Sequence, residues 1–318
     1  MENIKFISKG ITCSAWYIPA TTDKYMNSRG RPCVVMANGF GGTKDTGLLN
    51  FAEPLSKAGF DTFIFDYRGF GESGGFPRQN VSYKNQREDY HAAIAAVRSL
   101  PNIDRNRIAL WGTSYSGGHV LVAAAQDQKI SAVISMNPAT DGLAALSQIC
   151  RYGGLKQLTV AVAHGLKDLA YSLLGQKAHL IPIVGQPGTA AIISTPGSEV
   201  SYKAMAGPTW RNEVCARTAL EVARNRPINF AHQIKCPLLV QVGSNDQVTP
   251  PEAARKSASL ANGEVKLLEY PLDHFDFYNE PWQIKILEDQ INFLTQALAR
   301  PRVREPDFIA ILDHLKQK

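Results

Sequence analysis

The sequence predicts an α/β protein with a mostly parallel sheet, helices on both faces and an inserted helical cap. Three observations lead to this prediction. Short β-branched runs alternate with helix-like segments in residues 1–138, the alternation stops in residues 139–227, and it resumes in residues 228–318. Alternating strands and helices are joined by right-handed crossovers, which give a parallel sheet covered on both faces. We therefore expect a core in two parts, 1–138 and 228–318, interrupted by a cap at 139–227.

Composition and charge narrow the class of protein. The 318 residues are 44% hydrophobic and 19% charged, which is typical of a globular chain with a sizeable core. The net charge is +6, but Lys and Arg are scattered and not arranged in a stripe with aromatic residues. We interpret them as a solvated basic surface and expect no nucleic-acid partner.

The cysteines and the apolar runs bear on location. Five widely spaced cysteines contain no C-x-x-C pair and no zinc-like spacing, which favours a reducing compartment. The N-terminus lacks the pattern of a secretory signal, and no run reaches the roughly 18 apolar residues that span a bilayer. We expect a cytoplasmic protein without a membrane span.

The first part of the core shows its elements in a regular order. Residues 4–19 alternate apolar and polar positions, which predicts an antiparallel pair of strands. Helices are predicted from their apolar spacing and from the residues that end them, such as Gly59 and Pro101. The elements that follow are a strand at 32–38, a helix at 48–60, a strand with its turn at 61–69, a helix at 87–100, a strand with its turn at 107–117, a helix at 118–126 and a strand at 131–138.

The later elements include the predicted cap. Residues 181–198 are rich in Gly and Pro turns, and the cap has too much apolar content for a linker. Its leucines suggest an apolar roof over a pocket, although they could simply pack against one another. The helices expected in the cap lie at 155–175 and 211–225. After it we expect a strand at 236–246, helices at 251–261 and 281–299 with a strand at 265–271 between them, and a short helix at 307–315.

The segment GTSYSG, residues 112–117, follows a predicted strand and precedes a predicted helix. Hydrolytic enzymes use a G-x-S-x-G turn at such a position, where small residues let the backbone bend and expose a strained serine. Ser116 stands in place of the second glycine, so the motif is imperfect. If Ser114 is a nucleophile, it needs a base, because a free hydroxyl is a poor nucleophile at neutral pH.

His274 is the best candidate for the base, because it follows the last predicted strand at the carboxyl edge of the sheet. Asp246, at the end of the preceding strand, is the natural acid to accept its hydrogen bond and fix its tautomer. Asp273 and Asp276 flank the histidine, but sequence neighbours rarely reach its far nitrogen. We interpret the other histidines as packed or solvated; they are His91, His119, His164, His179, His232 and His314.

Acyl chemistry also needs donors for an oxyanion. One would be the backbone N–H of Tyr115, the residue after the candidate nucleophile. The other should come from the glycine-rich loop at residues 38–42, where Phe40 is the candidate. The alternative for Phe40 is a glycine-rich turn without a catalytic role.

Five landmarks in order carry a resemblance: NGFGG at 38–42, DYRGFGESGG at 66–75, GTSYSGG at 112–118, GSNDQVTP at 243–250 and DHFDFY at 273–278. With them the chain resembles the α/β-hydrolase superfamily over nearly its whole length. It is similar to the branch of dienelactone hydrolases, acetyl xylan esterases and X-Pro dipeptidyl-peptidase-like proteins. The resemblance implies a Ser114, Asp246, His274 triad acting on a small-molecule acyl substrate, with no metal or organic cofactor.

Several activities fit this constellation. The leading prediction is an esterase for small or medium apolar esters, working through an acyl-enzyme. An acyltransferase or thioesterase would use the same triad, and a peptidase for short peptides would need an acidic group to hold the peptide N-terminus. The chain could also be a ligand-binding protein on the same scaffold without catalysis. The oligomeric state stays open, with a dimer among the options.

Overall fold

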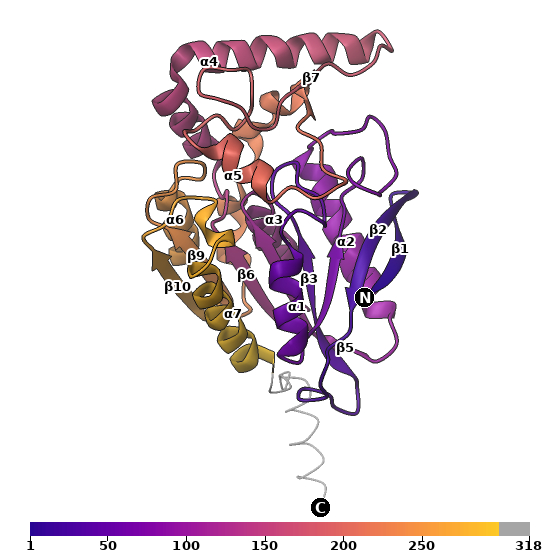
Figure 1. Ribbon diagram of the computed structural model, residues 1–318. Coiled ribbons are helices and arrows are strands. Elements are labelled where there is room, and N and C mark those ends of the chain that lie inside the picture. Colours follow the sequence, from indigo (N-terminus) through magenta and orange to yellow (C-terminus); the bar gives the residue numbers. More distant parts are fainter. Residues whose placement is uncertain (299–318) are drawn as a thin grey trace, which may run out of the picture.

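A computed structural model describes residues 1–298 of the chain, and a central sheet of eight strands organises this part (Figure 1). The strand order is β1-β2-β4-β3-β5-β6-β9-β10. β1 and β2 form the expected antiparallel hairpin, β2 pairs antiparallel with β4, and the remaining neighbours are parallel. The strands are β1 (Glu2–Ser8), β2 (Ile11–Ile18), β3 (Arg31–Ala37), β4 (Asp61–Phe65), β5 (Ile103–Thr113), β6 (Ala132–Met136), β9 (Leu238–Gly243) and β10 (Val265–Tyr270).

Helices cover both faces of the sheet, which confirms the predicted fold class. Side chains alternate between two apolar clusters, as the pleat of a strand requires: Val35 of β3 belongs to one, and its neighbours Val34 and Met36 belong to the other. The first cluster takes residues from α2 (Tyr83–Ser99), α3 (Tyr115–Gln126) and α6 (Pro251–Leu260). The second takes residues from α1 (Leu49–Lys57) and α7 (Trp282–Leu298). Both sides of the parallel strands are therefore buried.

A long insertion separates β6 from β9 and lies at the upper end of the molecule in Figure 1. Its largest element is α4 (Gly142–Leu173), which bends at Gly154, where φ is 68° and ψ is 177°. The predicted helix at 155–175 is the second arm of α4, and the first arm was not predicted. The other elements are β7 (Leu180–Ile181), α5 (Ser198–Ala204), β8 (Val214–Cys215) and three 3₁₀ helices, η1 (Ala216–Leu220), η2 (Val222–Arg224) and η3 (Pro227–Gln233).

The helix predicted at 211–225 is wrong. β8 pairs antiparallel with β7, and 3₁₀ turns follow it. Backbone groups here bond across the fold: the N–H of Cys215 donates to Gln79 O at 2.8 Å, and that of Ala216 donates to His179 O at 2.9 Å. These tertiary hydrogen bonds replace the i to i−4 pattern that the apolar spacing suggested.

The closing helix is confirmed as α7, and a 3₁₀ helix, η4 (Asp276–Tyr278), precedes it. The helix predicted at 307–315 lies outside the described residues. Within residues 1–298, none of the helices is long and apolar enough to cross a membrane. The boundaries 139–227 of the cap stay a prediction.

Candidate active site

Ser114 lies at a sharp bend between β5 and α3, with φ of 55° and ψ of −119°. The bend works because its neighbours are small. A Cβ on Gly112 would lie 2.3 Å from the Ser116 carbonyl oxygen, and one on Gly39 would lie 2.8 Å from the Ser114 Cβ. The Ser114 N–H donates to Met136 O at 2.9 Å, so the strained residue is held against β6.

Ser116 fits in place of the second glycine because the fold provides partners for its side chain. Its hydroxyl forms hydrogen bonds of 2.7 Å with the hydroxyls of Tyr67 and Tyr90. Ser116 is fully buried, and the Tyr90 hydroxyl also donates to Trp111 O at 2.9 Å. Ser116, which replaces the second glycine of the motif, is thus a buried residue whose hydroxyl is hydrogen-bonded beneath the bend.

The structure brings Ser114, His274 and Asp246 together, as the sequence predicts. His274 Nε2 lies 3.0 Å from Ser114 Oγ, and His274 Nδ1 lies 2.6 Å from Asp246 Oδ2. All three side chains are buried. An ionised carboxylate only accepts, so Nδ1 carries the proton and Nε2 is free to accept from the serine hydroxyl. This arrangement can remove a proton from Ser114 and stabilise the resulting imidazolium.

The loop after β9 fixes the Asp246 carboxylate with three further donors. Oδ1 accepts from the N–H groups of Val248 at 2.8 Å and Thr249 at 2.7 Å, and Oδ2 accepts from Thr249 Oγ1 at 2.7 Å. These contacts leave the carboxylate only one orientation relative to His274.

Two residues that sequence reasoning did not assign position the histidine loop. Asn137 Nδ2 donates to His274 O at 2.7 Å. Asp273 Oδ1 accepts from the N–H groups of His274 at 2.7 Å and Gln247 at 2.8 Å, so it ties the loop of the base to the loop of the acid. The sequence holds no signal for Asn137 beyond its place at the end of β6, because a backbone contact leaves no pattern.

The glycine-rich loop after β3 approaches the serine from the other side. Phe40 and Tyr115 both line the pocket, and their rings meet edge to face at 5.4 Å. Within residues 1–298 the backbone N–H groups of Phe40 and Tyr115 have no protein acceptor. Two unpaired donors beside Ser114 are what an oxyanion site requires.

The insertion and a buried ion pair hold this loop in place. Lys44 Nζ lies 2.8 Å from Asp66 Oδ2, both side chains are at most 1% exposed, and the Lys44 N–H also donates to Asp66 Oδ1 at 2.7 Å. The Tyr202 hydroxyl, from α5, donates to Phe40 O at 2.9 Å. Asn38 Nδ2 donates to Thr46 O at 2.6 Å and closes the loop on itself.

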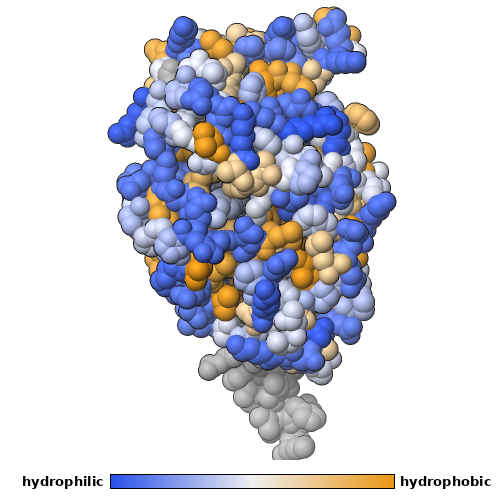
Figure 2. Space-filling view, in the orientation of Figure 1, coloured by the Kyte–Doolittle hydropathy of each residue, from blue (hydrophilic) through white to orange (hydrophobic). Residues whose placement is uncertain are grey.

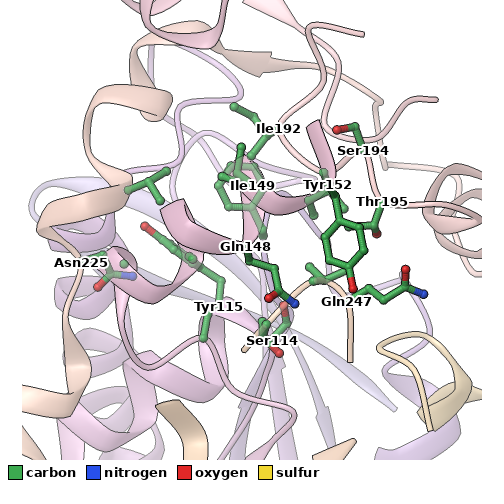
Figure 3. Close-up of a pocket in the computed structure, with 18 of the residues that line it drawn as sticks. Ser114, Tyr115, Gln148, Ile149, Tyr152, Ile192, Ser194, Thr195, Asn225 and Gln247 are labelled. Atoms are coloured by element: carbon green, nitrogen blue, oxygen red, sulfur yellow. The ribbon is translucent and has the colours of Figure 1, made fainter. Parts of the chain in front are cut away.

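A pocket of about 830 Å³, including its open mouth, leads to Ser114. In Figure 3 the Gln148 side chain points toward Ser114, and Ile149 and Ile192 lie on the far wall. The walls come from the strand ends, the first arm of α4 and the insertion. The lining residues are Phe40, Ser114, Tyr115, Ala139, Asp141, Gly142, Ala145, Gln148, Ile149, Tyr152, Gln157, Ile192, Ile193, Ser194, Thr195, Val222, Asn225, Gln247, Val248 and Thr249.

The leucines of the second arm of α4 do not roof the pocket, so this interpretation of the cap is wrong for them. Leu155, Leu166 and Leu173 are 73%, 55% and 80% exposed, and none lines the pocket. Figure 2 shows hydrophobic residues among polar ones on the surface at this end of the molecule. The bend at Gly154 turns most of the second arm away, and Gln157 near its start still lines the pocket.

The remaining histidines lie apart from the triad. His119 is fully buried against Gln86, with Nε2 2.9 Å from Gln86 Oε1, and burial followed by the nearby Arg87 charge holds its pKa well below the ordinary value. His164 and His179 stack in the insertion, with rings 5.0 Å apart. His314 lies outside the described residues. Within the described part of the chain, no three His, Cys, Asp or Glu side chains gather as metal ligands would.

Comparisons with known proteins identify the family of the chain. The profile of the family described as "Serine aminopeptidase, S33" matches residues 28–273. The quorum-quenching protein AidA of Acinetobacter baumannii is 38% identical over 92% of this chain and 93% of its own length. The thiohydrolase aneE of Aspergillus aculeatus is 40% identical, over 36% of each chain.

A solved structure repeats the fold. The polyketide transferase grgF of Penicillium sp. is 29% identical over 57% of this chain and 56% of its own. The crystal structure of the α/β hydrolase GrgF from Penicillium sp. sh18 superposes with a TM-score of 0.77 at 23% identity, covering 94% of this chain and 99% of that one. The narrower likeness to the dienelactone hydrolase branch stays a prediction. The chain belongs to the serine aminopeptidase S33 family of α/β hydrolases.

Proposed function

We propose that the protein is a serine hydrolase that cleaves carboxylic esters of apolar acyl groups, with Ser114 as nucleophile, His274 as base and Asp246 as the acid that orients it. One observation carries the proposal. Contacts of 3.0 Å and 2.6 Å join the three side chains, and Ser114 lines a largely apolar pocket. A nucleophile, a base and an orienting carboxylate in this relation support acyl transfer through a covalent intermediate.

The steps follow from the contacts. Ser114 Oγ bonds to the ester carbon while its proton moves to His274 Nε2, and the carbonyl oxygen becomes an oxyanion beside the N–H groups of Phe40 and Tyr115. The intermediate collapses to an acyl-serine, and the alcohol leaves with the proton from Nε2. Water then attacks the acyl-serine, gives its proton to Nε2 and releases the carboxylic acid. The serine recovers its proton in this last step.

The walls favour an acyl substrate over a peptide with a free N-terminus. An aminopeptidase holds the substrate ammonium with a carboxylate, and Asp141 is the only acidic residue that lines the pocket in the described chain. Its two oxygens are occupied by Arg226, with Nε at 2.9 Å and Nη2 at 3.0 Å, and it also caps α4 through the Leu143 N–H. The description of the family therefore does not transfer to this chain as an activity.

Acyl transfer or thioester cleavage is a second candidate, favoured by the names of relatives. AneE is named a thiohydrolase and grgF a polyketide transferase, and both match parts of this chain. The triad would form the same acyl-serine from a thioester, and an alcohol or amine could replace water in the second step. The acceptor that attacks the acyl-serine, water or another nucleophile, decides between hydrolysis and transfer.

Labelling separates an enzyme from a binding protein. A fluorophosphonate probe should modify wild-type protein on Ser114 and leave Ser114→Ala unlabelled. Turnover of p-nitrophenyl esters from acetate to decanoate should exceed turnover of aminoacyl-p-nitroanilides. Acyl-coenzyme A thioesters, with and without an added alcohol, then distinguish hydrolysis from transfer. Absence of labelling and of turnover in wild type would overturn the proposal.

A further inference from the structure

We propose that one end of the pocket is a hydrogen-bonding subsite, built from Tyr115, Asn225 and Arg87, which binds a carbonyl oxygen carried by the acyl chain away from the scissile bond. This inference rests on the proposed function and adds a substrate class to it: oxygenated acyl groups such as oxo acids. Figure 3 shows the Tyr115 ring running from the serine toward Asn225 along the pocket wall. Both residues line the pocket and are more than nine-tenths buried.

The direction of each hydrogen bond follows from what each group can donate. Arg87 is a donor only, so the Nη2 contact with Asn225 Oδ1 makes that oxygen the acceptor. The amide nitrogen of Asn225 is then the end that faces the Tyr115 hydroxyl. Burial and the Glu221 carboxylate raise the pKa of Tyr115, while Arg87 and the hydrogen bond from Asn225 lower it. The phenol thus accepts from Asn225 and keeps its own hydrogen.

That hydrogen has no acceptor among residues 1–298. Two other polar side chains of the lining are engaged by the protein: Gln148 Nε2 donates to Asp246 O at 3.1 Å, and Gln247 Nε2 donates to Asp273 Oδ2 at 2.7 Å. A buried donor without a partner loses free energy until a ligand or water supplies an oxygen. The Tyr115 hydroxyl therefore discriminates in favour of chains that bring an acceptor to it.

Arg87 fixes the orientation of the Asn225 amide in the subsite. In the described chain no carboxylate pairs with Arg87, whose guanidinium lies over the rings of Tyr83 and Phe230 at 4.8 and 5.8 Å. Its Nε is buried without a partner, and burial lowers its pKa. Arg87 holds the Asn225 oxygen as an acceptor, while the Glu221 carboxylate acts more strongly than Arg87 on the Tyr115 hydroxyl, so the orientation of the hydrogen-bonding groups, and not a net positive charge, selects the ligand.

Contacts around Asn225 fix the position of the subsite relative to Ser114. The Gly142 N–H donates to Asn225 O at 2.9 Å, and a Cβ on Gly142 would lie 1.8 Å from Val222 O. Asn225 is therefore packed against the start of α4, while Tyr115 is the residue next to Ser114. A fixed separation between nucleophile and donor predicts a preferred position of the oxygen along the chain.

The experiment compares p-nitrophenyl octanoate with its 4-, 5-, 6- and 7-oxo derivatives. Wild type should prefer one or two adjacent oxo positions by roughly three- to tenfold in kcat/KM, the worth of one hydrogen bond. Tyr115→Phe removes the donor and should bring this ratio to about one. Asn225→Asp is sharper, because the new carboxylate pairs with Arg87 and accepts the Tyr115 hydrogen. Asn225→Asp should therefore lose the oxo preference as Tyr115→Phe does, and its melting temperature should be unchanged or higher.

Tyr152→Phe is the matched control, because it removes the hydroxyl of the other tyrosine in the lining; it should keep the oxo preference within twofold of wild type. Calorimetry can measure the affinities of octanoic and oxo-octanoic acids for Ser114→Ala. These affinities report on the subsite in the absence of turnover. Ester turnover with equal rates for all five esters would overturn the subsite and leave the hydrolase proposal intact. An oxo preference retained in both Tyr115→Phe and Asn225→Asp would also overturn it. If no ester is turned over but oxo-octanoic acids still bind Ser114→Ala more tightly than octanoic acid does, only the hydrolase proposal is overturned.

Discussion

The strand ends around Ser114 and the insertion between β6 and β9 each contain a fully buried aspartate in an ion pair, and they hold it differently. Asp66 pairs with Lys44, whose side chain is 1% exposed. Asp168 pairs with Arg217, whose side chain is 19% exposed, and in the same region Leu155 and Leu173 reach water. Both partners of the ion pair at the strand ends are thus closed from solvent, whereas one partner of the pair in the insertion is partly exposed.

The two regions therefore make different contributions to the candidate active site. The reactive groups come from the closed region, where backbone strain at Ser114 and the contacts of Asp246 need rigid surroundings. The insertion contributes walls and a few polar ties, such as the one from Tyr202 to Phe40. We therefore expect changes in the sheet region to cost chemistry or global stability, and comparable changes in the insertion to have smaller effects.

The largest expected effect is on turnover. Ser114→Ala should lower kcat/KM for p-nitrophenyl esters by about 10³- to 10⁶-fold with the fold intact, the range seen when one triad member is removed. Ser194→Ala changes a serine of the same pocket on the insertion side and should cost less than about fivefold. Similar losses in the two variants would contradict the division between regions.

The ion pairs test stability. Lys44→Met leaves Asp66 buried without its counter-charge and should lower the free energy of unfolding by about 3–5 kcal/mol. Arg217→Met should cost only about 1–2 kcal/mol, because water reaches that pair and the His179 N–H at 2.7 Å still serves Asp168. Urea denaturation of both variants measures the difference. A larger loss for Arg217→Met would reverse the comparison.

Acid should separate the two regions further. Burial and Arg87 keep His119 neutral in the folded protein, while the unfolded chain binds its proton below about pH 6.5. Stability therefore falls as pH drops below that value, by up to about 1.4 kcal/mol per pH unit. His119→Gln should remove this slope. His179→Gln should change it less, since that ring is half-buried, although burial and Lys167 lower its pKa too. Equal slopes in wild type and His119→Gln would contradict the prediction.

The smallest expected effect is at the contact between the regions. Tyr202→Phe loses the hydrogen bond to Phe40 O but keeps its ring between Trp210 and Phe275. Roughly a three- to tenfold fall in kcat with little change in KM should follow, because the loop donor is less well placed in the transition state. A boronic acid inhibitor should lose affinity in parallel. Tyr171→Phe, in the insertion but away from the loop, is the control; a rise in KM alone for Tyr202→Phe would point to substrate binding instead.

The same division explains what the sequence could predict. Strands, turns and the positions of Ser114, Asp246 and His274 follow from local periodicity and from the rule that functional side chains follow parallel strands. The insertion resisted prediction because tertiary contacts decide its structure. The 211–225 segment bonds to Gln79 and His179, and the first arm of α4 has no outstanding periodic signal. The sequence offers no signal for Asn137, and for Asp273, set aside there as the acid, it offers none for a positioning role, because both roles depend on loops that meet only in space.

Ser116 limits how this protein can change over time. Its hydroxyl bonds to Tyr67 and Tyr90 at once, so the glycine usual in such turns would remove this partner from the Tyr67 hydroxyl in a dry interior, while Tyr90 would still donate to Trp111 O. Glycine should therefore cost less stability at this position once Tyr67 has lost its hydroxyl. The order in which substitutions at Ser116 and Tyr67 occur therefore affects the stability of the intermediate variant.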